Sequence, residues 1–334
     1  MRFILKIPLL IVLLLMMSNV FSQEKKGSFI KQVSLYHEND AFFAPKNQDD
    51  NYTAGLRIDV VTKELKFWQP FFKLKANDSK YYSHINFGFQ SFTPTKISAT
   101  EVLRDDRPYA SYTFLSLGRT QLFKNTAFYS ELSIGALGLP LTEKAQIYIH
   151  KNNFLGTERL VPRGWDNQIE DGGHLAINYK LNYLYAYNDW VSNNFVIPSI
   201  RFSSNLGNYT TDFYVGTQLS FFNINYTSSA LNFNEIVAFK KFKTNKTRFN
   251  LFIEPGLRWN LYNATLQGAL FSDNSVYTVD RSEISNFLFD IHLGVNLNIK
   301  DVIILKYTLT RRTQEYSYGE NSHWWGGFGL GVRF

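Results

Sequence analysis

The sequence predicts an all-β fold: a transmembrane antiparallel β-barrel of about twelve strands with a short helix in an external loop. Three observations favour it. Segments of alternating apolar and polar residues recur along the chain, the N-terminus has the pattern of an export signal, and the C-terminal strand is aromatic. A barrel strand shows apolar side chains to lipid and polar ones to the interior, so it alternates with a period of two. This alternation accounts for a mean hydropathy of only −0.21 in a chain that spans a membrane.

The first 22 residues predict a cleaved signal peptide. Arg2 and Lys6 form its basic start, and the apolar run from residue 9 to residue 17 is too short for a bilayer, which needs about 20 residues. A retained N-terminal anchor is the alternative, and the short run argues against it. We therefore expect a signal peptide at 1–22 and a barrel domain at 23–334. The chain has no cysteine, so no disulfide supports the exported domain.

The last strand predicts an outer-membrane location in a Gram-negative bacterium. From Trp324 onward aromatic, aliphatic and glycine residues alternate, and the chain ends on Phe334. Outer-membrane barrels commonly end in this way, whereas a soluble sandwich rarely ends on a strand so rich in aromatics and glycine. The net charge of +7 suits an anionic surface such as lipopolysaccharide phosphates. Nucleic acid is not expected as a partner, because the basic residues are scattered and the chain is exported.

Alternation after the first hairpin defines ten further strands, and the even total is what bacterial barrels require. Their expected bounds are 83–92, 110–121, 126–136, 174–187, 195–202, 211–222, 248–261, 286–299, 302–312 and 323–334. An extra short strand within 233–242 would break the even count. Several charged residues belong to the inner faces, where we expect hydrogen-bonded ion pairs. They are Asp59, Glu131, Lys180, Glu254, Arg258 and Asp290.

The first hairpin gathers side chains that can do chemistry. Alternation on both sides of a short polar loop predicts two strands, and parity puts Asp40 and Thr53 on the polar face at the same rim, beside Asn39. A carboxylate, an amide and a hydroxyl at one end of a hairpin can bind a metal or polarise a carbonyl. A polar turn without function is the alternative interpretation.

The connection at 138–173 is too long to be a mere link and is predicted to be external, as are 39–51, 93–109 and 263–285. It contains a short helix that Thr142 is expected to cap, and Gln146 and His150 share one of its faces. His150 is then on the same rim as the first hairpin and is a candidate catalytic residue. The link at 223–247 does not fit the expected alternation of long external and short periplasmic connections.

Together these segments resemble the outer-membrane lipid A 3'-O-deacylase family. The matching pieces occur in the family's order and cover nearly all of the exported chain. They are Glu38–Asp40, Tyr52–Leu56, Thr93–Pro94, Asp106–Ala110, His150, Gly156–Glu158, Gly164–Gln168 and Tyr262–Gly268.

The resemblance implies a calcium-dependent carboxylic ester hydrolase that removes the 3'-linked acyloxyacyl chain of lipid A in the outer leaflet. It also implies an active site between the barrel wall and a helix of an external loop. The site residues that it carries over are Asn39, Asp40, Thr53, His150 and Glu158. In this scheme His150 takes a proton from water, Glu158 orients it, Asn39 stabilises the oxyanion and Asp40 holds Ca²⁺.

Two other functions remain open from the sequence. An outer-membrane phospholipase shares the compartment and the metal, but it has a serine next to its histidine, and no His-x-Ser stands beside His150. A porin or structural barrel without activity is the second alternative. No Gly-x-Ser-x-Gly elbow is present, so water rather than serine is the expected nucleophile.

Overall fold

The computed structural model describes residues 28–40, 51–65, 74, 76–77, 79–123, 125–151, 161–187, 196–221, 247–300 and 302–334. The predicted signal peptide, Glu158 and the 233–242 segment lie outside the described residues. Within them, no helix is both long and apolar enough to cross a membrane.

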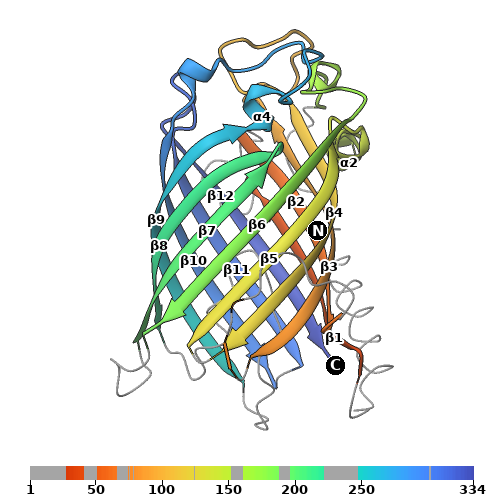
Figure 1. The fold of residues 1–334 in the computed structure, drawn as a ribbon. Coiled ribbons are helices and arrows are strands. Elements are labelled where there is room, and N and C mark those ends of the chain that lie inside the picture. The colour runs from red at the N-terminus through yellow and green to blue at the C-terminus, as the bar shows by residue number, and fades with distance from the viewer. Residues whose placement is uncertain are drawn as a thin grey trace.

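Twelve antiparallel strands form a closed barrel (Figure 1), which confirms the predicted fold class. Each strand pairs with its neighbours in the chain, and β1 pairs with β12 to close the wall. The strands are β1 (Ile30–Asn39), β2 (Asn51–Lys63), β3 (Lys80–Thr93), β4 (Ala110–Phe123), β5 (Thr126–Leu137), β6 (His174–Ala186), β7 (Val196–Gly207), β8 (Thr210–Phe221), β9 (Arg248–Asn263), β10 (Phe287–Ile299), β11 (Ile303–Thr313) and β12 (Ser322–Arg333). The terminal Phe334 extends this closure, since its backbone N–H donates to the carbonyl of Lys31.

The helical segments gather at one end of the barrel, which carries the external loops (Figure 1). They are α2 (Leu141–Lys151), the 3₁₀ turn Trp165–Asn167, α4 (Ala264–Gln267) and the 3₁₀ turn Arg281–Glu283. Gly138 starts the connection to α2 with φ 72°, and a Cβ there would collide with the carbonyl of Glu170. Only glycine therefore suits this sharp exit from β5.

The barrel interior is filled with paired charges, as the sequence predicts. Polar side chains in a closed wall must find partners inside, because neither lipid nor bulk water is available to them. The ion pairs are Asp59 with His84 (3.2 Å), Glu131 with Arg57 (2.5 Å), Glu254 with Arg201 (3.0 Å), and Arg258 with both Asp212 (2.6 Å) and Asp290 (3.1 Å). Lys180 lies 5.9 Å from the ring centroid of Tyr129.

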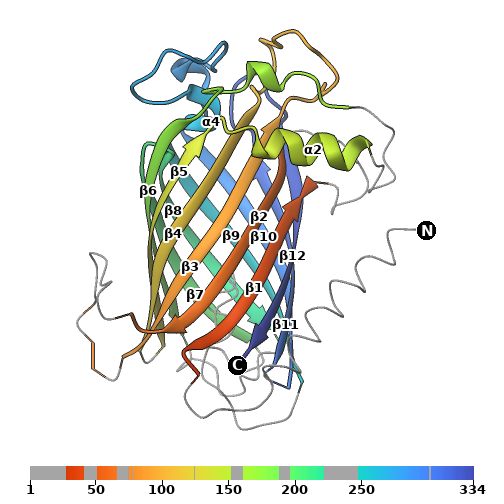
Figure 2. The same ribbon diagram turned by 90° about the vertical axis from the view of Figure 1, so that its right-hand side faces the viewer.

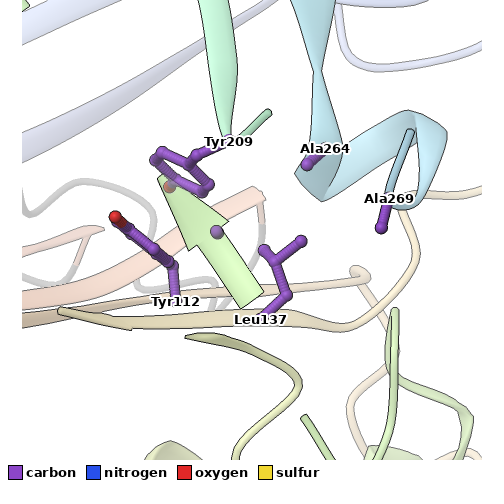
Figure 3. Packing of buried hydrophobic residues seen from close by; sticks show 6 residues of the cluster. Tyr112, Leu137, Tyr209, Ala264 and Ala269 are labelled. Carbon is purple, nitrogen blue, oxygen red and sulfur yellow. The ribbon is translucent and has the colours of Figure 1, made fainter. Parts of the chain in front are cut away.

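An aromatic and aliphatic cluster packs under α4 at the external mouth (Figure 3). The rings of Tyr112 and Tyr209 stack with centroids 3.8 Å apart, and Leu137 and Ala264 pack beside them. The Tyr209 hydroxyl also donates to Gln90 at 2.6 Å, so the loop between β7 and β8 is tied to β3. The cluster packs at the external end of the barrel and joins β4, β5, β6 and α4 to the loop between β7 and β8.

Candidate active site between the outer wall and helix α2

Helix α2 buries its polar face. Thr142, Gln146 and His150 follow one another at four-residue spacing and are all buried, with His150 only 6% exposed. The opposite face exposes Leu141 and Tyr148. A helix on a soluble protein shows the reverse pattern, because the apolar stripe is the one that is normally buried. This inverted pattern indicates that α2 covers a polar surface, which is therefore a candidate functional site.

The structure confirms that Gln146 and His150 share a face, but the expected helix cap is wrong. The helix begins at Leu141, one residue before Thr142, so Thr142 lies inside the first turn. Its side chain is buried with the polar face of α2 instead of accepting from the helix's first N–H groups. The backbone N–H of Lys144 bonds to the carbonyl of Pro140, which closes the first turn.

The surface that α2 covers is the outer wall near the external ends of the strands, where α2 contacts β3 (Figure 2). Along the outward face of β3, Ile85 and Phe87 are exposed, Phe89 is half-buried, and Ser91 and Thr93 are fully buried. The wall therefore changes from apolar to hydroxyl-bearing in the direction of α2. The polar part is out of contact with solvent although it faces away from the lumen.

A β-bulge turns Thr53 onto this outer wall. The register between β2 and β3 shifts between Tyr52 and Ala54, and a bulge adds one residue and breaks the alternation of faces. The Tyr52 hydroxyl donates to the carboxylate of Glu38 on the lumen side at 2.7 Å. The Thr53 hydroxyl lies 2.6 Å from that of Thr93 on the outer side. The prediction from parity, which puts Thr53 on the inner polar face, is wrong, and the bulge is the reason.

Asn39 and Asp40 stand at the external end of β1, next to this bulge. Asn39 is paired with Ala54 across β1 and β2, so it neighbours Thr53, and it follows the lumen-facing Glu38. Both Asn39 and Asp40 are buried. The structure thus brings the predicted amide, carboxylate and hydroxyl to one rim.

Asn39 and Thr53 therefore belong to β1 and β2, Asp40 directly follows β1, and His150 belongs to the helix laid over the neighbouring strand β3. Glu158 lies outside the described residues, so its place near His150 stays a prediction. The position of α2 is set by Trp165, whose indole N–H donates to the Gln146 side chain at 2.9 Å. Trp165 in turn packs on Tyr109, with ring centroids 4.8 Å apart.

Sequence reasoning assigned no role to Arg107, although it belongs to the family motif at 106–110. Its guanidinium is fully buried and donates to Glu315 and to Thr265, both at 2.7 Å. It also lies 4.3 Å from the ring centroid of Phe92. These contacts join the loops after β3, β9 and β11. One signal in the sequence could have suggested this role. Arg107 is an arginine in a loop motif to which no ligand was assigned, and such an arginine can instead bind a carboxylate of another loop.

Two carboxyl groups in the external loops have shifted pKa values. Burial would raise the pKa of Glu315, but the guanidinium groups of Arg107 and Arg312 outweigh it and hold that pKa at about 2. On α2, burial and the nearby carboxylates of Asp166 and Asp171 raise the pKa of Glu143. Glu143 therefore faces the 165–171 segment of its own loop.

The donor groups at the rim fit a hard cation. Among the described residues no three His, Cys, Asp or Glu side chains gather as metal ligands. A cation here would rest on the Asp40 carboxylate with neutral oxygens, such as the Asn39 amide and backbone carbonyls. Calcium accepts this mixture of ligands, whereas zinc prefers nitrogen and sulfur. The chemistry of the residues present is therefore compatible with Ca²⁺.

Comparison with known proteins decides the family. A family model described as "Outer membrane protein LpxR" matches residues 9–334. The chain belongs to the LpxR family. The match confirms the family resemblance and the outer-membrane location that were inferred from the sequence. No curated protein matches the chain.

Several solved outer-membrane barrels resemble the chain to different degrees. LpxR from Salmonella typhimurium is 17% identical, with a TM-score of 0.69, and the match covers 91% of this chain and 100% of that one. The β domain of the Bordetella autotransporter BrkA is 8% identical, with a TM-score of 0.43 and coverage of 92% and 100%. The NalP translocator domain from Neisseria meningitidis is 9% identical, with a TM-score of 0.41 and coverage of 94% and 92%. At these identities the likeness to the Salmonella protein shows the fold.

Proposed function

We propose that this protein is a lipid A deacylase that hydrolyses the 3'-linked acyloxyacyl ester in the outer leaflet, with Ca²⁺ as cofactor. The observation that carries the proposal is the covered polar strip on the outer wall. It lies where the apolar band of β3 ends, between Phe87 and Thr93. The ester bonds of a membrane lipid are found at this level, between the acyl chains and the headgroups. Membership of the LpxR family supports the same substrate class.

His150 is the proposed general base. It is a histidine, the residue type that most often serves as a general base, and it is buried on the face that covers the outer wall. Removing a proton from water at this place would generate hydroxide next to the ester. Glu158 is proposed to orient the imidazole. Gln146, held by Trp165, fixes the turn of α2 that precedes His150.

The rim of β1 and β2 is proposed to hold the reacting carbonyl. The Asn39 amide donates to the developing oxyanion, a contact that is worth about 3–4 kcal/mol in a well-studied hydrolase. The Thr53 hydroxyl, kept in place by Thr93, orients the same oxygen or a bound water. Calcium, held by Asp40, would add positive charge that stabilises the oxyanion or a phosphate of the substrate.

The interior argues against a porin. The ion pairs from Asp212 through Arg258 and Asp290 to Arg312 run as one connected chain across β8 to β11. Such a chain occupies the lumen with charges that already satisfy one another. The stacked Tyr112 and Tyr209 lie at the external end of the barrel. The chemically available polar groups are therefore on the outer wall.

The deciding experiment is mass spectrometry of lipid A from cells that express the wild-type protein or the His150→Ala variant. We expect the wild type to remove the mass of one acyloxyacyl group and the variant to leave lipid A intact. Lipid A that keeps all its acyl chains in the presence of folded wild-type protein would refute the proposal. Release of fatty acids from phospholipids instead would favour the phospholipase alternative.

A further inference from the structure

The outward face of α2 is as distinctive as the buried one. Leu141 and Tyr148, seven residues apart, are 45% and 61% exposed, and Lys144 and Lys151 are exposed on the same side of the helix. On a helical projection these four side chains lie opposite the polar stripe that ends at His150. The face thus combines two apolar or aromatic groups with two cations, and it is turned away from the barrel wall.

We infer that this face of α2 is a binding surface for the anionic headgroups and upper acyl chains of the outer leaflet, so that α2 is sandwiched between the barrel and the membrane. A helix that lies in a membrane interface shows this composition: Lys on the headgroup side, and aromatic or aliphatic residues toward the acyl chains. Figure 2 shows α2 lying across the strands, not along the barrel axis, as an interfacial helix must.

The surface is continuous with an interface already described. The lipid-facing band of the wall includes Phe87 on β3 and Leu115 on β4, both exposed, and these two residues pair across the strands. Because α2 contacts β3 just above this band, its outer face extends the apolar surface into the headgroup region. A soluble partner protein would have to approach through the lipid that surrounds the band. The leaflet is therefore the occupant that the geometry favours.

Charge supports an anionic lipid. In the part of the chain that the structure describes, neither Lys144 nor Lys151 forms an ion pair. The two lysines are seven positions apart, about 10 Å along the helix, which is enough for each lysine to meet a different phosphate. The acidic Glu143 lies near Asp166 and Asp171 in the loop, and Lys144 also interacts with it electrostatically. A lysine near an anionic membrane surface attracts its lipids appreciably.

The contact can be measured at a single residue, since the chain has no cysteine. A bimane fluorophore would be attached to Tyr148→Cys, to Leu115→Cys as a lipid-facing reference, and to Phe271→Cys as a water-facing reference, Phe271 being 88% exposed in the loop after α4. Each variant would be reconstituted in vesicles of phosphatidylcholine that contain brominated lipid. Heat-modifiability would confirm that each barrel is folded.

We expect brominated lipid to quench the label at position 148 nearly as strongly as the label at 115, and to leave the label at 271 almost unquenched. Brominated phosphatidylglycerol should quench at 148 several-fold more effectively than brominated phosphatidylcholine. This preference should become weaker in Lys144→Gln and in Lys151→Gln, and it should disappear in the variant that carries both substitutions. Quenching at 148 no stronger than at 271 would overturn the leaflet contact. Equal quenching by the two lipids with both lysines present would overturn the role of the lysines. Neither readout depends on hydrolysis, so failure here is distinct from failure of the proposed deacylase activity.

Discussion

The lumen and the outer wall under α2 both bury polar groups, but for different reasons. In the lumen many charges meet an opposite charge, as Glu254 meets Arg201 and Asp290 meets Arg312. Under α2 the outer wall carries hydroxyls and an amide where lipid would otherwise require apolar side chains. Polar residues inside a barrel stabilise the barrel. Polar residues on its outside are costly, and this asymmetry makes the covered polar residues candidates for function.

The largest expected difference between the two regions is in their response to metal removal. EDTA should abolish deacylation and Ca²⁺ should restore it, because the proposed cation rests on Asp40 and neutral oxygens. Asp40→Asn should have the same effect as EDTA, whereas Asp59→Asn in the lumen, where Asp59 pairs with His84, should keep its calcium response. The measurement is acyl-chain release from purified lipid A in detergent. Full turnover by metal-free protein would remove calcium from the proposal.

Next in size is the effect of His150→Ala, which should lower the rate about 10²–10⁴-fold while the barrel stays folded. Helix α2 is external, so the substitution removes little packing from the wall. The matched lumen variant is His292→Ala, which loses a hydrogen bond to Thr310 at 3.1 Å and should affect stability more than turnover. Single-turnover rates with heat-modifiability as the folding check would separate the two. Wild-type turnover in folded His150→Ala would contradict the assignment.

The contacts that Glu315 makes with Arg107 and Arg312 should produce a third effect, on the free energy of unfolding as a function of pH. The pKa of Glu315 is about 2 in the folded protein, below its value of about 4.5 in an unfolded chain. Its contribution is therefore complete above pH 4.5 and is lost as the pH falls toward 2, with an upper limit of about 3 kcal/mol. Thermal unfolding from pH 6 to pH 2 should show this loss, and Glu315→Gln should flatten it. A wild type and a variant with parallel pH curves would exclude Glu315 as the cause.

The smallest expected effect comes from single hydroxyls. Thr53→Val should slow turnover roughly fivefold, since one hydrogen bond is worth about 1 kcal/mol. Thr308→Val, which removes a 2.6 Å contact with the Tyr36 hydroxyl in the lumen, should instead lower the unfolding temperature at unchanged turnover. Steady-state rates and melting curves of the two variants would decide between the regions. Equal losses of rate in the Thr53 and Thr308 variants would contradict the proposed difference between the outer wall and the lumen.

The sequence alone was sufficient to predict the strands of the barrel wall and to name most of the candidate residues. A period of two is a local property, so each of the twelve strands could be recognised from its own residues, and the inner charges Asp59, Glu131 and Glu254 were assigned correctly. Motifs in family order indicated the LpxR family from the residues alone. Gln146 and His150 were correctly placed on one helix face, because helical spacing is also local.

Tertiary structure decided which side of the wall the site is on. Alternation cannot detect a bulge, so parity placed Thr53 in the lumen, whereas the extra residue between Tyr52 and Ala54 turns it outward. The roles of Thr142 and Arg107 were likewise set by contacts far along the chain, with helix packing in one case and with Glu315 and Thr265 in the other. The sequence determined which residues alternate; only the closed barrel, with α2 laid across its outer surface, determined which of them meet. The physical reason is that strand period and helical spacing are set by neighbouring residues, whereas burial depends on every element that packs against them.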